Sequence, residues 1–217
     1  MLKGLVFDMD GTMVDNSAFH KEAFRIFFEK HGCYEPFAEE WFARRNEDIL
    51  MHYIPEECAR YGWETLSDEK EVIYRNTFRD VIKPVPGLLD FLSSSVESGL
   101  KCCVGSSAPR QNVEFHLDVL KVGKYMTNWL CMEDVKIGKP DPDIYLKCCA
   151  GIGCDPSECI VFEDATSGVE AGLKAGCKVV GIAFWNDPAK LTEAGAHLVV
   201  PDFTHLTVGQ LQELMEE

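Results

Sequence analysis

Two aspartates, Asp8 and Asp10, follow directly after the first apolar run of this 217-residue chain. The run, Leu5–Phe7, is typical of a strand buried on both faces of a parallel sheet, and Gly11 allows the backbone to turn sharply behind it. Ligands of open α/β sheets bind beyond the carboxyl ends of the strands, which is where these acids stand. Close carboxylates repel each other unless a cation or a shared proton offsets their charge, and Mg²⁺ completed by a substrate phosphate meets that need.

This stretch has two simpler interpretations. A surface turn rich in Asp and Gly is common and involves no chemistry. A calcium-binding EF-hand loop counted from Asp8 needs Gly where Met13 stands and a bidentate Glu where Phe19 stands. The sequence therefore excludes the calcium loop and leaves the surface turn open.

Hydroxyl groups follow a second apolar run. Ser106 and Ser107 come after Cys102–Gly105 and shortly before Pro109, which is typical of the start of a helix. A hydroxyl at the end of a strand can bind phosphate together with the amides of a helix N-terminus. The alternative is that one of these serines only caps the helix.

Lys139 is the third candidate, in the loop Ile137–Asp143. Asp141 and Pro142 are expected to cap and open the next helix, so the loop would hold the ammonium group in one place. There it can neutralise a nucleophilic carboxylate and a phosphoryl oxygen. The alternative is a solvated loop lysine, for which Lys136 serves as an example.

Acidic residues end another apolar run: Glu163 and Asp164 come directly after Cys159–Phe162. Small residues follow, among them Gly168 and Gly172, which allow the next helix to lie close to the sheet. The alternative is a pair of acids that only favours the helix dipole. Each alternative holds for one motif alone, but four such groups in order at strand ends do not arise easily by chance.

The elements that position these groups form a repeating pattern from residue 86 onward. Short apolar runs alternate with amphipathic segments, which predicts a doubly wound, Rossmann-like parallel α/β sheet. The predicted later strands are Lys101–Gly105, Trp129–Cys131, Cys159–Phe162, Lys178–Ala183 and His197–Val200. The predicted helices are Leu88–Glu97, Asn112–Leu120, Ile144–Ala150, Thr166–Ala175, Pro188–Ala194 and Thr207–Leu214.

Residues 14–82 interrupt this pattern, and we expect a helical insertion without strands between the first strand and the rest. Its predicted helices are Asp15–His31, Glu39–Ala43, Glu47–Tyr61 and Ser67–Val81. Lys83–Gly87, with two prolines and a glycine, marks the boundary. The predicted organisation is one domain from residues 1–13 and 83–217 and a small all-helical domain from residues 14–82.

The composition of the chain argues against some classes of binding partner. A formal charge of −15 argues against nucleic acid or an anionic membrane, and no apolar run reaches the length of a membrane span. The first strand begins without a preceding signal peptide, and the ten cysteines are interpreted as small buried hydrophobes in a reducing cytosol. We therefore expect a cytoplasmic protein, a monomer or weak homodimer, whose anionic ligand is attracted by local cations.

The four motifs and their order resemble those of the haloacid dehalogenase (HAD) superfamily of phosphotransferases. The helical insertion after the first strand is similar to the C1 cap of its β-phosphoglucomutase-like subfamily. By this resemblance Asp8 is the nucleophile, Asp10 the general acid and base, and Lys139 the cation on the phosphoryl group. The resemblance also implies Mg²⁺ ligands, namely Asp8, the carbonyl of Asp10, Glu163 and Asp164. The implied residues near phosphate or substrate are Gly11, His20, Arg45, Asn46, Lys70, Ser106, Ser107 and Arg110.

The resemblance implies a Mg²⁺-dependent phosphatase acting on a small phosphorylated metabolite, a sugar phosphate, through an aspartyl-phosphate; the alternative is a phosphosugar mutase. Asn46 falls where a β-phosphoglucomutase carries Arg, which weakens the case for a mutase because a bisphosphate needs a second strong anion site. His20 and Lys70 also have simpler interpretations, as a buried or capping histidine and a surface lysine. A non-catalytic binding protein and an interaction module stay open as other classes.

Overall fold

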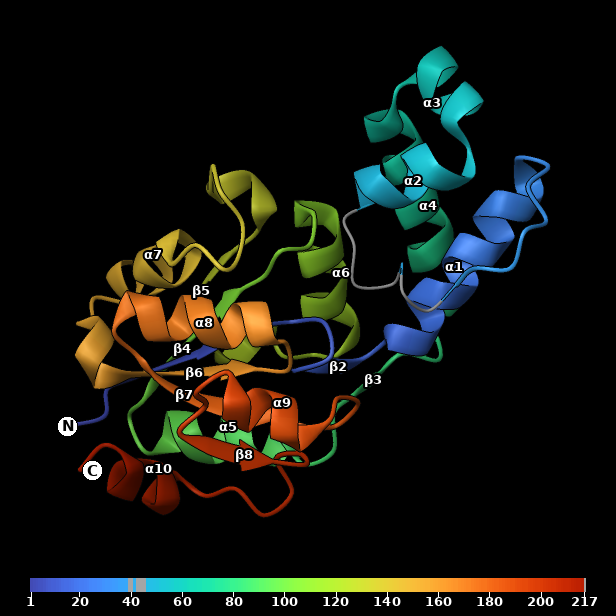
Figure 1. Ribbon diagram of the computed structural model, residues 1–217. Coiled ribbons are helices and arrows are strands. Elements are labelled where there is room, and N and C mark those ends of the chain that lie inside the picture. Colours follow the sequence, from blue (N-terminus) through green and yellow to red (C-terminus); the bar gives the residue numbers. More distant parts are fainter. Residues whose placement is uncertain (39–40, 42–45, 217) are drawn as a thin grey trace. The chain divides into compact units, whose positions relative to one another are not determined.

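The computed structural model describes residues 1–38, 41 and 46–216 (Figure 1). The chain divides into two compact units, one formed by Met1–Asp15 with Lys83–Glu217 and the other by Asn16–Ile82. None of the helices in the described residues is long and apolar enough to cross a membrane.

A six-stranded sheet forms the centre of the first unit, with the order β5-β4-β1-β6-β7-β8. Every neighbouring pair is parallel. The strands are β1 (Gly4–Phe7), β4 (Lys101–Gly105), β5 (Met126–Leu130), β6 (Cys159–Glu163), β7 (Lys178–Ile182) and β8 (Leu198–Val200). All four residues of β1 are buried, as the continuous apolar run predicts for a central strand. The predicted doubly wound α/β fold is confirmed.

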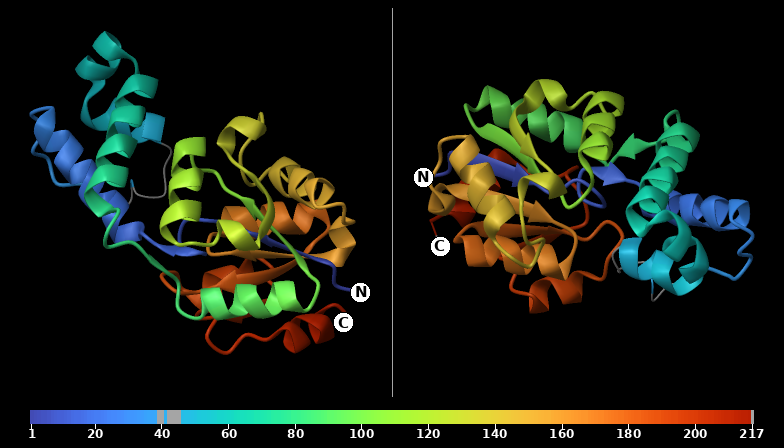
Figure 2. Two further views of the ribbon diagram at one scale, coloured as in Figure 1. Left: turned by 180° about the vertical axis from the view of Figure 1, so that it is seen from behind. Right: turned by 90° about the horizontal axis from the view of Figure 1, so that it is seen from above.

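Helices cover both faces of this sheet. Helices α7 and α8 pack on each other and on the central strands, whereas α5 and α10 pack together on the opposite face (Figures 1 and 2). The helices are α5 (Leu88–Glu97), α6 (Arg110–Val119), α7 (Asp143–Gly151), α8 (Thr166–Ala175), α9 (Pro188–Glu193) and α10 (Val208–Leu214), with short 3₁₀ turns at Gly123–Tyr125, Met132–Asp134 and Pro156–Glu158. Their bounds lie within two residues of the predicted ones, while β5 begins at Met126, earlier than predicted.

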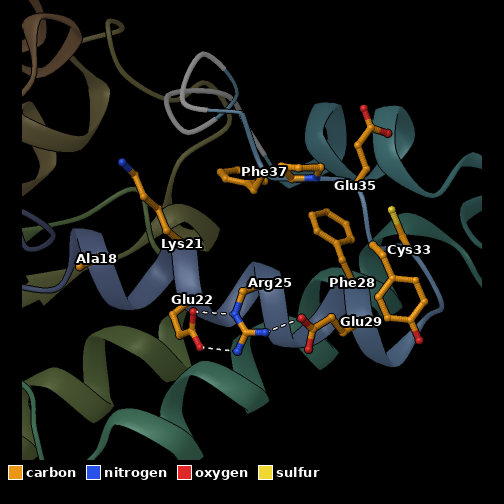
Figure 3. Close-up of a pocket in the computed structure, with 11 residues that line it drawn as sticks. Ala18, Lys21, Glu22, Arg25, Phe28, Glu29, Cys33, Glu35 and Phe37 are labelled. Carbon is orange, nitrogen blue, oxygen red and sulfur yellow. Dashed lines mark hydrogen bonds and ion pairs between the residues drawn. The ribbon is translucent and has the colours of Figure 1, made fainter.

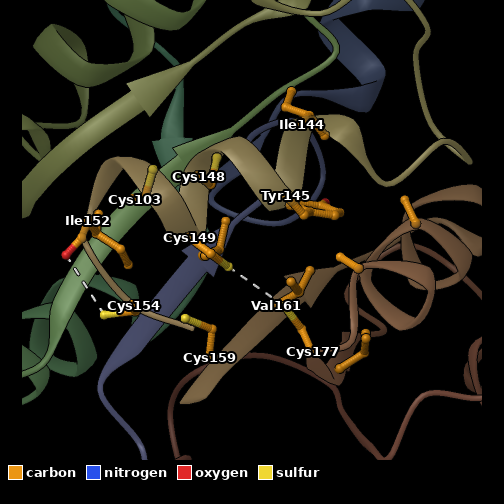
Figure 4. Close-up of a cluster of buried hydrophobic side chains, with 14 of the residues drawn as sticks. Cys103, Ile144, Tyr145, Cys148, Cys149, Ile152, Cys154, Cys159, Val161 and Cys177 are labelled. Atoms are coloured by element: carbon orange, nitrogen blue, oxygen red, sulfur yellow. Dashed lines mark hydrogen bonds between the residues drawn. The ribbon is translucent and has the colours of Figure 1, made fainter. Parts of the chain in front are cut away.

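The core differs in chemistry on the two faces of the sheet. On the α5 face, Phe7 stacks on Phe162 with ring centroids 4.7 Å apart, and Phe91 and Phe203 pack around this pair. On the α7 face, Val6 lies in a cluster that contains six cysteines (Figure 4). All ten cysteines of the chain are free thiols and nine are buried, so the interpretation as small hydrophobes is confirmed.

The connections between the two units correct the predicted boundary. Val14–Asp15 forms strand β2, which pairs antiparallel with β3 (Lys83–Pro84). Val14 and Asp15 therefore belong to the α/β unit, and the expectation that residues 14–82 hold no strand is wrong at this edge. Helix α1 consequently begins at Ser17, not at Asp15.

The second unit is helical in the described residues, with α1 (Ser17–Lys30), α2 (Asn46–Tyr53), α3 (Pro55–Tyr61) and α4 (Trp63–Phe78). The predicted helix Glu47–Tyr61 is in fact two helices, because Pro55 cannot supply an N–H to continue α2 and instead opens α3. Helix α4 starts and ends earlier than the predicted Ser67–Val81. Apart from Trp41, the predicted helix Glu39–Ala43 lies outside the described residues.

Aromatic side chains fill the core of this helical unit. Phe24, Phe27 and Phe28 of α1 pack with Ile49 and Leu50 of α2. Beside them, Phe28 and Phe37 line a hollow along α1, where Arg25 is held between Glu22 and Glu29 (Figure 3). The apolar stripe of α1 is thus buried within its own unit, as helical spacing predicts.

Candidate active site

The order of the strands brings three of the four predicted motifs to one edge of the sheet. Strands β4, β1 and β6 are neighbours and parallel, so their carboxyl ends lie side by side. Asp8 follows β1, Ser106 follows β4, and Glu163 is the last residue of β6. The fourth motif, Lys139, reaches this edge from the segment before α7.

Lys139 joins two of these motifs. Its Nζ lies 2.5 Å from Asp8 Oδ1 and 2.6 Å from Glu163 Oε1, with only 7% of the side chain exposed. Burial alone would lower the pKa of Lys139, but the carboxylates of Asp8 and Glu163 outweigh it and hold this pKa above its usual range. The ammonium group is therefore fixed and charged. The alternative interpretation of Lys139 as a solvated loop lysine is wrong.

Three carboxylates cluster at this site. Asp8, Glu163 and Asp164 each present an oxygen, and these atoms lie within 4.8 Å of one another. Burial raises the pKa of Asp8 to about 7, against the attraction of Lys139 and with added repulsion from Glu163. Burial, followed by repulsion from Glu163 and Asp8, raises the pKa of Asp164 well above its usual value. Three clustered carboxylate oxygens, together with the raised pKa values of Asp8 and Asp164, fit a hard divalent cation such as Mg²⁺.

Glu163 is held from several sides. The Tyr145 hydroxyl donates to its Oε1 at 2.5 Å, and the backbone N–H groups of Asp164 and Ala165 donate to Oε2 at 3.1 and 3.2 Å. Burial and the nearby Glu163 raise the pKa of Tyr145 well above its usual value, so its hydroxyl stays a donor. Tyr145 could not be identified from the sequence, because its place on the buried face of α7 is also what helical spacing predicts for a core residue.

Gly11 makes room for Asp164. Its φ is +80°, and a Cβ atom at this position would lie 2.2 Å from Asp164 Oδ2. The Thr12 hydroxyl lies 3.5 Å from Asp164 Oδ1. Gly11 therefore serves the turn predicted after β1 and also a close approach between two motifs that are far apart in the sequence.

Asp10 has a neighbour that the sequence does not indicate. His116 on α6 is completely buried, and its Nδ1 lies 3.8 Å from Asp10 Oδ1. The side chain of Asp10 is one-third exposed, unlike that of Asp8. A histidine on the buried face of a predicted helix carries no signal in the sequence that would link it to Asp10.

The segment after β4 has its own hydrogen bonds. Ser106 is buried and its Oγ accepts from the Ala108 N–H at 3.0 Å, while Ser107 is exposed. Neither serine caps α6, whose N-cap is Pro109. The guanidinium of Arg110 donates to Asp134 Oδ1 at 2.8 Å and lies over the ring of Trp129. A role for these residues in phosphate binding stays a prediction.

The fold and the motifs agree with a comparison of the whole sequence. Residues 5–182 match the family described as haloacid dehalogenase-like hydrolase. The chain belongs to this family. The expected superfamily is thereby confirmed, and the match spans the helical unit as well as all four motifs of the site.

Relatives with established names cover more than four-fifths of the chain. A phosphorylated carbohydrates phosphatase of Thermotoga maritima is 29% identical over 208 residues, which are 92% of this chain and 94% of the relative. The fructose-1-phosphate phosphatase YqaB of Escherichia coli is 30% identical over 182 residues, which are 82% and 95%. The crystal structure of a putative β-phosphoglucomutase from Thermotoga maritima superimposes with a TM-score of 0.76 at 27% identity, covering 98% of this chain and 99% of the other. The expected β-phosphoglucomutase-like subfamily is confirmed.

In this haloacid dehalogenase-like hydrolase, three predicted residues of the helical unit share one polar cluster. Lys70 Nζ lies 3.0 Å from His20 Nδ1 and 2.7 Å from Glu71 Oε1, and Asn46 Nδ2 lies 3.0 Å from the same Glu71 oxygen. Lys70 is only 2% exposed, so its interpretation as a surface lysine is wrong. His20 stacks on Tyr74 with ring centroids 4.0 Å apart. The predicted residue Arg45 lies outside the described residues.

Proposed function

We propose that the protein is a Mg²⁺-dependent phosphatase that hydrolyses a small phosphorylated metabolite, a sugar phosphate, through an aspartyl-phosphate on Asp8. The observation that carries this proposal is the position of Lys139, 2.5 Å from Asp8 and 2.6 Å from Glu163 at the edge of the sheet. A nucleophilic carboxylate must approach a phosphate dianion, and a fixed ammonium group lowers the repulsion between them.

Asp8, Asp10 and Lys139 each have one role in the proposed reaction. Asp8 attacks phosphorus in line, so the bond to the leaving oxygen breaks as the acyl-phosphate bond forms. Asp10 gives its proton to the leaving alcohol and then takes one from the water that hydrolyses the aspartyl-phosphate. Lys139 stays charged throughout and stabilises the phosphoryl oxygens. Phosphate is released and Asp8 is regenerated.

Asp8, the Asp10 carbonyl, Glu163 and Asp164 are the residues that would hold Mg²⁺. When bound, the ion offsets the negative charge that Asp8 and the phosphate bring together. The raised pKa values of Asp8 and Asp164 support this assignment. They arise from burial and from repulsion between the carboxylates, and a bound cation would offset both.

The names of the relatives support the class of substrate. One is named for phosphorylated carbohydrates and another for fructose 1-phosphate, and both cover more than four-fifths of this chain. A phosphosugar mutase is the second candidate, supported by the similarity to a putative β-phosphoglucomutase. Both reactions begin with transfer of the phosphoryl group to Asp8.

A panel of phosphorylated metabolites, with release of free phosphate as the readout, tests the proposal. We expect the highest kcat/KM on sugar phosphates, loss of turnover with excess chelator, and loss of turnover in Asp8→Asn. The matched control is Asp90→Asn, which makes the same change at an exposed position of α5 and should keep full activity. Near-normal turnover in folded Asp8→Asn would contradict the covalent mechanism, and full turnover in excess chelator would contradict the requirement for Mg²⁺.

A further inference from the structure

The loop after β7 makes two contacts that the proposed mechanism does not use. Asn186 Nδ2 lies 2.8 Å from the backbone oxygen of Asp164 and 3.0 Å from its Oδ2. Asn186 is exposed, so burial does not force its side chain toward this carboxylate. Both contacts are directed at a residue of the acidic cluster.

This loop is anchored on either side of Asn186. On one side, Trp185 Nε1 donates to Asp15 Oδ1 at 3.1 Å, and Asp15 pairs with Lys83 between β2 and β3. On the other side, Asp187 caps α9 by accepting from the Ala189 N–H at 2.9 Å. Because both neighbours are held, the Asn186 amide has a defined place beside Asp164.

We propose that Asn186 is a positioning residue for the cation site, where it orients the Asp164 carboxylate, and that Trp185 anchors the loop on Asp15. A carboxylate with one oxygen held by an amide donor loses rotational freedom, and its other oxygen stays available to a cation. Gly11 leaves room for the held oxygen, since a side chain there would collide with Oδ2. Groups that orient metal ligands in this way affect metal affinity by about 10–100-fold.

The test is the binding of Mg²⁺, and of Mn²⁺ as a second probe, to the whole protein without substrate, measured by calorimetry. For Asn186→Ala we expect the Kd of both ions to rise by about 10–100-fold, with no change in Tm in chelator. The rise in Tm that Mg²⁺ produces should shrink accordingly. Gln212→Ala removes an exposed amide from α10 and serves as the matched control, with Kd unchanged.

Trp185→Phe tests the anchor, because phenylalanine keeps an aromatic ring and lacks the N–H that reaches Asp15. We expect a rise in Kd smaller than that of Asn186→Ala. An unchanged Kd in Trp185→Phe would overturn the anchoring role, and an unchanged Kd in Asn186→Ala would overturn the positioning role.

This inference rests on the proposed function, but the two fail differently. If the parent protein binds neither ion, both the cation in the proposed function and the role of Asn186 are wrong. If the parent binds Mg²⁺ and Asn186→Ala binds it equally well, only the role of Asn186 is wrong. If Asn186→Ala lowers Tm in chelator as well as raising Kd, the residue stabilises the fold and the positioning role is overturned.

Discussion

A Cβ atom at position 168 would lie 1.8 Å from Cδ of Glu163, so the absence of a side chain at Gly168 makes room for the Glu163 carboxylate. From the sequence, the glycines of this helix are expected to allow close packing on the sheet. That holds for Gly172, where an added Cβ would lie 2.8 Å from Val179 Cγ2. Gly168 serves the site, since it lies in the first turn of α8 and against Glu163, the last residue of β6.

Gly168→Ala should therefore damage activity more than stability. The methyl group must displace the Glu163 carboxylate, which is held by Tyr145 and Lys139. A displacement of about 1 Å in such a site costs on the order of 10²-fold in rate. We expect kcat to fall by about that factor, measured as phosphate release, while the folded fraction in circular dichroism stays high.

Gly172→Ala is the matched control for this change. It adds the same methyl group to the same helix, but the group meets Val179 and Val161 in the core. We expect a lower Tm with little change in kcat of the folded protein. If Gly168→Ala behaved like Gly172→Ala in both measurements, the role of Gly168 at the site would be wrong.

The stability of the metal-free protein should depend on Asp8 and on pH. Burial raises the pKa of Asp8 to about 7, whereas an unfolded aspartate titrates near ~4. Between these values the folded protein binds the proton more tightly than the unfolded chain, so its free energy of unfolding falls as pH rises. Asp8→Asn cannot titrate here. The Tm of Asp8→Asn minus that of the parent should therefore increase from pH 4 to 7. The increase should be about 2–4 °C for each kcal/mol of free energy of unfolding that the parent loses.

Chelator is needed in this experiment, because bound Mg²⁺ favours the ionised carboxylate and would oppose the trend. Asp90→Asn, at an exposed position, should show a constant difference from the parent over the same pH range. A difference between Asp8→Asn and the parent that stayed flat, or that decreased with pH, would contradict the raised pKa of Asp8.

Much of the α/β unit was predictable from sequence because strand ends, apolar runs and turn residues are local signals. The run before Asp8 predicts a buried strand, and Asp8, Ser106 and Glu163 each follow directly after an apolar run. Tyr145 and His116 were missed for the opposite reason. Each lies on the buried face of a helix, where a core residue and a residue contacting the site share the same spacing, and only the tertiary contact distinguishes them.

The helical unit was less predictable. Its amphipathic segments carry no strand pattern to limit their bounds, and the break at Pro55 was not recognised within one continuous helical pattern. Lys70 shows the same limit for side chains. A lysine on an acidic helix indicates a solvated residue, whereas the buried Lys70 contacts His20, lies over the Phe24 ring and pairs with the carboxylate of Glu71.

Lys70→Met should destabilise the helical unit strongly. Lys70 and Glu71 are almost completely buried and lie 2.7 Å apart, so removing the lysine charge breaks a buried ion pair while the Glu71 carboxylate stays buried. Breaking such a pair costs about 3–5 kcal/mol. We expect urea unfolding to report a loss of this order, and the double variant Lys70→Met/Glu71→Gln to recover part of it.

Lys30→Met provides the comparison. Lys30 pairs with Glu69 at 2.6 Å, but the lysine side chain is 61% exposed. A surface pair of this kind contributes at most about 1 kcal/mol. Equal losses in Lys30→Met and Lys70→Met would mean that the buried pair contributes no more than a solvated one.

We expect water, not a second sugar hydroxyl, to be the acceptor of the phosphoryl group. A mutase must bind a bisphosphate and therefore needs a second strong anion site. Arg110 is already paired with Asp134 and stacked on Trp129. The Asn46 amide donates to Ser67 and to the buried carboxylate of Glu71. An amide in place of a bidentate guanidinium lacks a charge-assisted pair of about 1.5–3 kcal/mol. In the proposed mechanism, water needs only Asp10 as a base.

We therefore expect hydrolysis of simple phosphomonoesters to be faster than interconversion of hexose 1- and 6-phosphates. The experiment incubates β-glucose 1-phosphate with the protein, Mg²⁺ and a trace of glucose 1,6-bisphosphate, and follows free phosphate and glucose 6-phosphate together. Arg110→Ala should leave the release of phosphate nearly unchanged, because the guanidinium is held by its own neighbours. Glucose 6-phosphate forming much faster than free phosphate, and lost in Arg110→Ala, would reject the phosphatase in favour of the mutase.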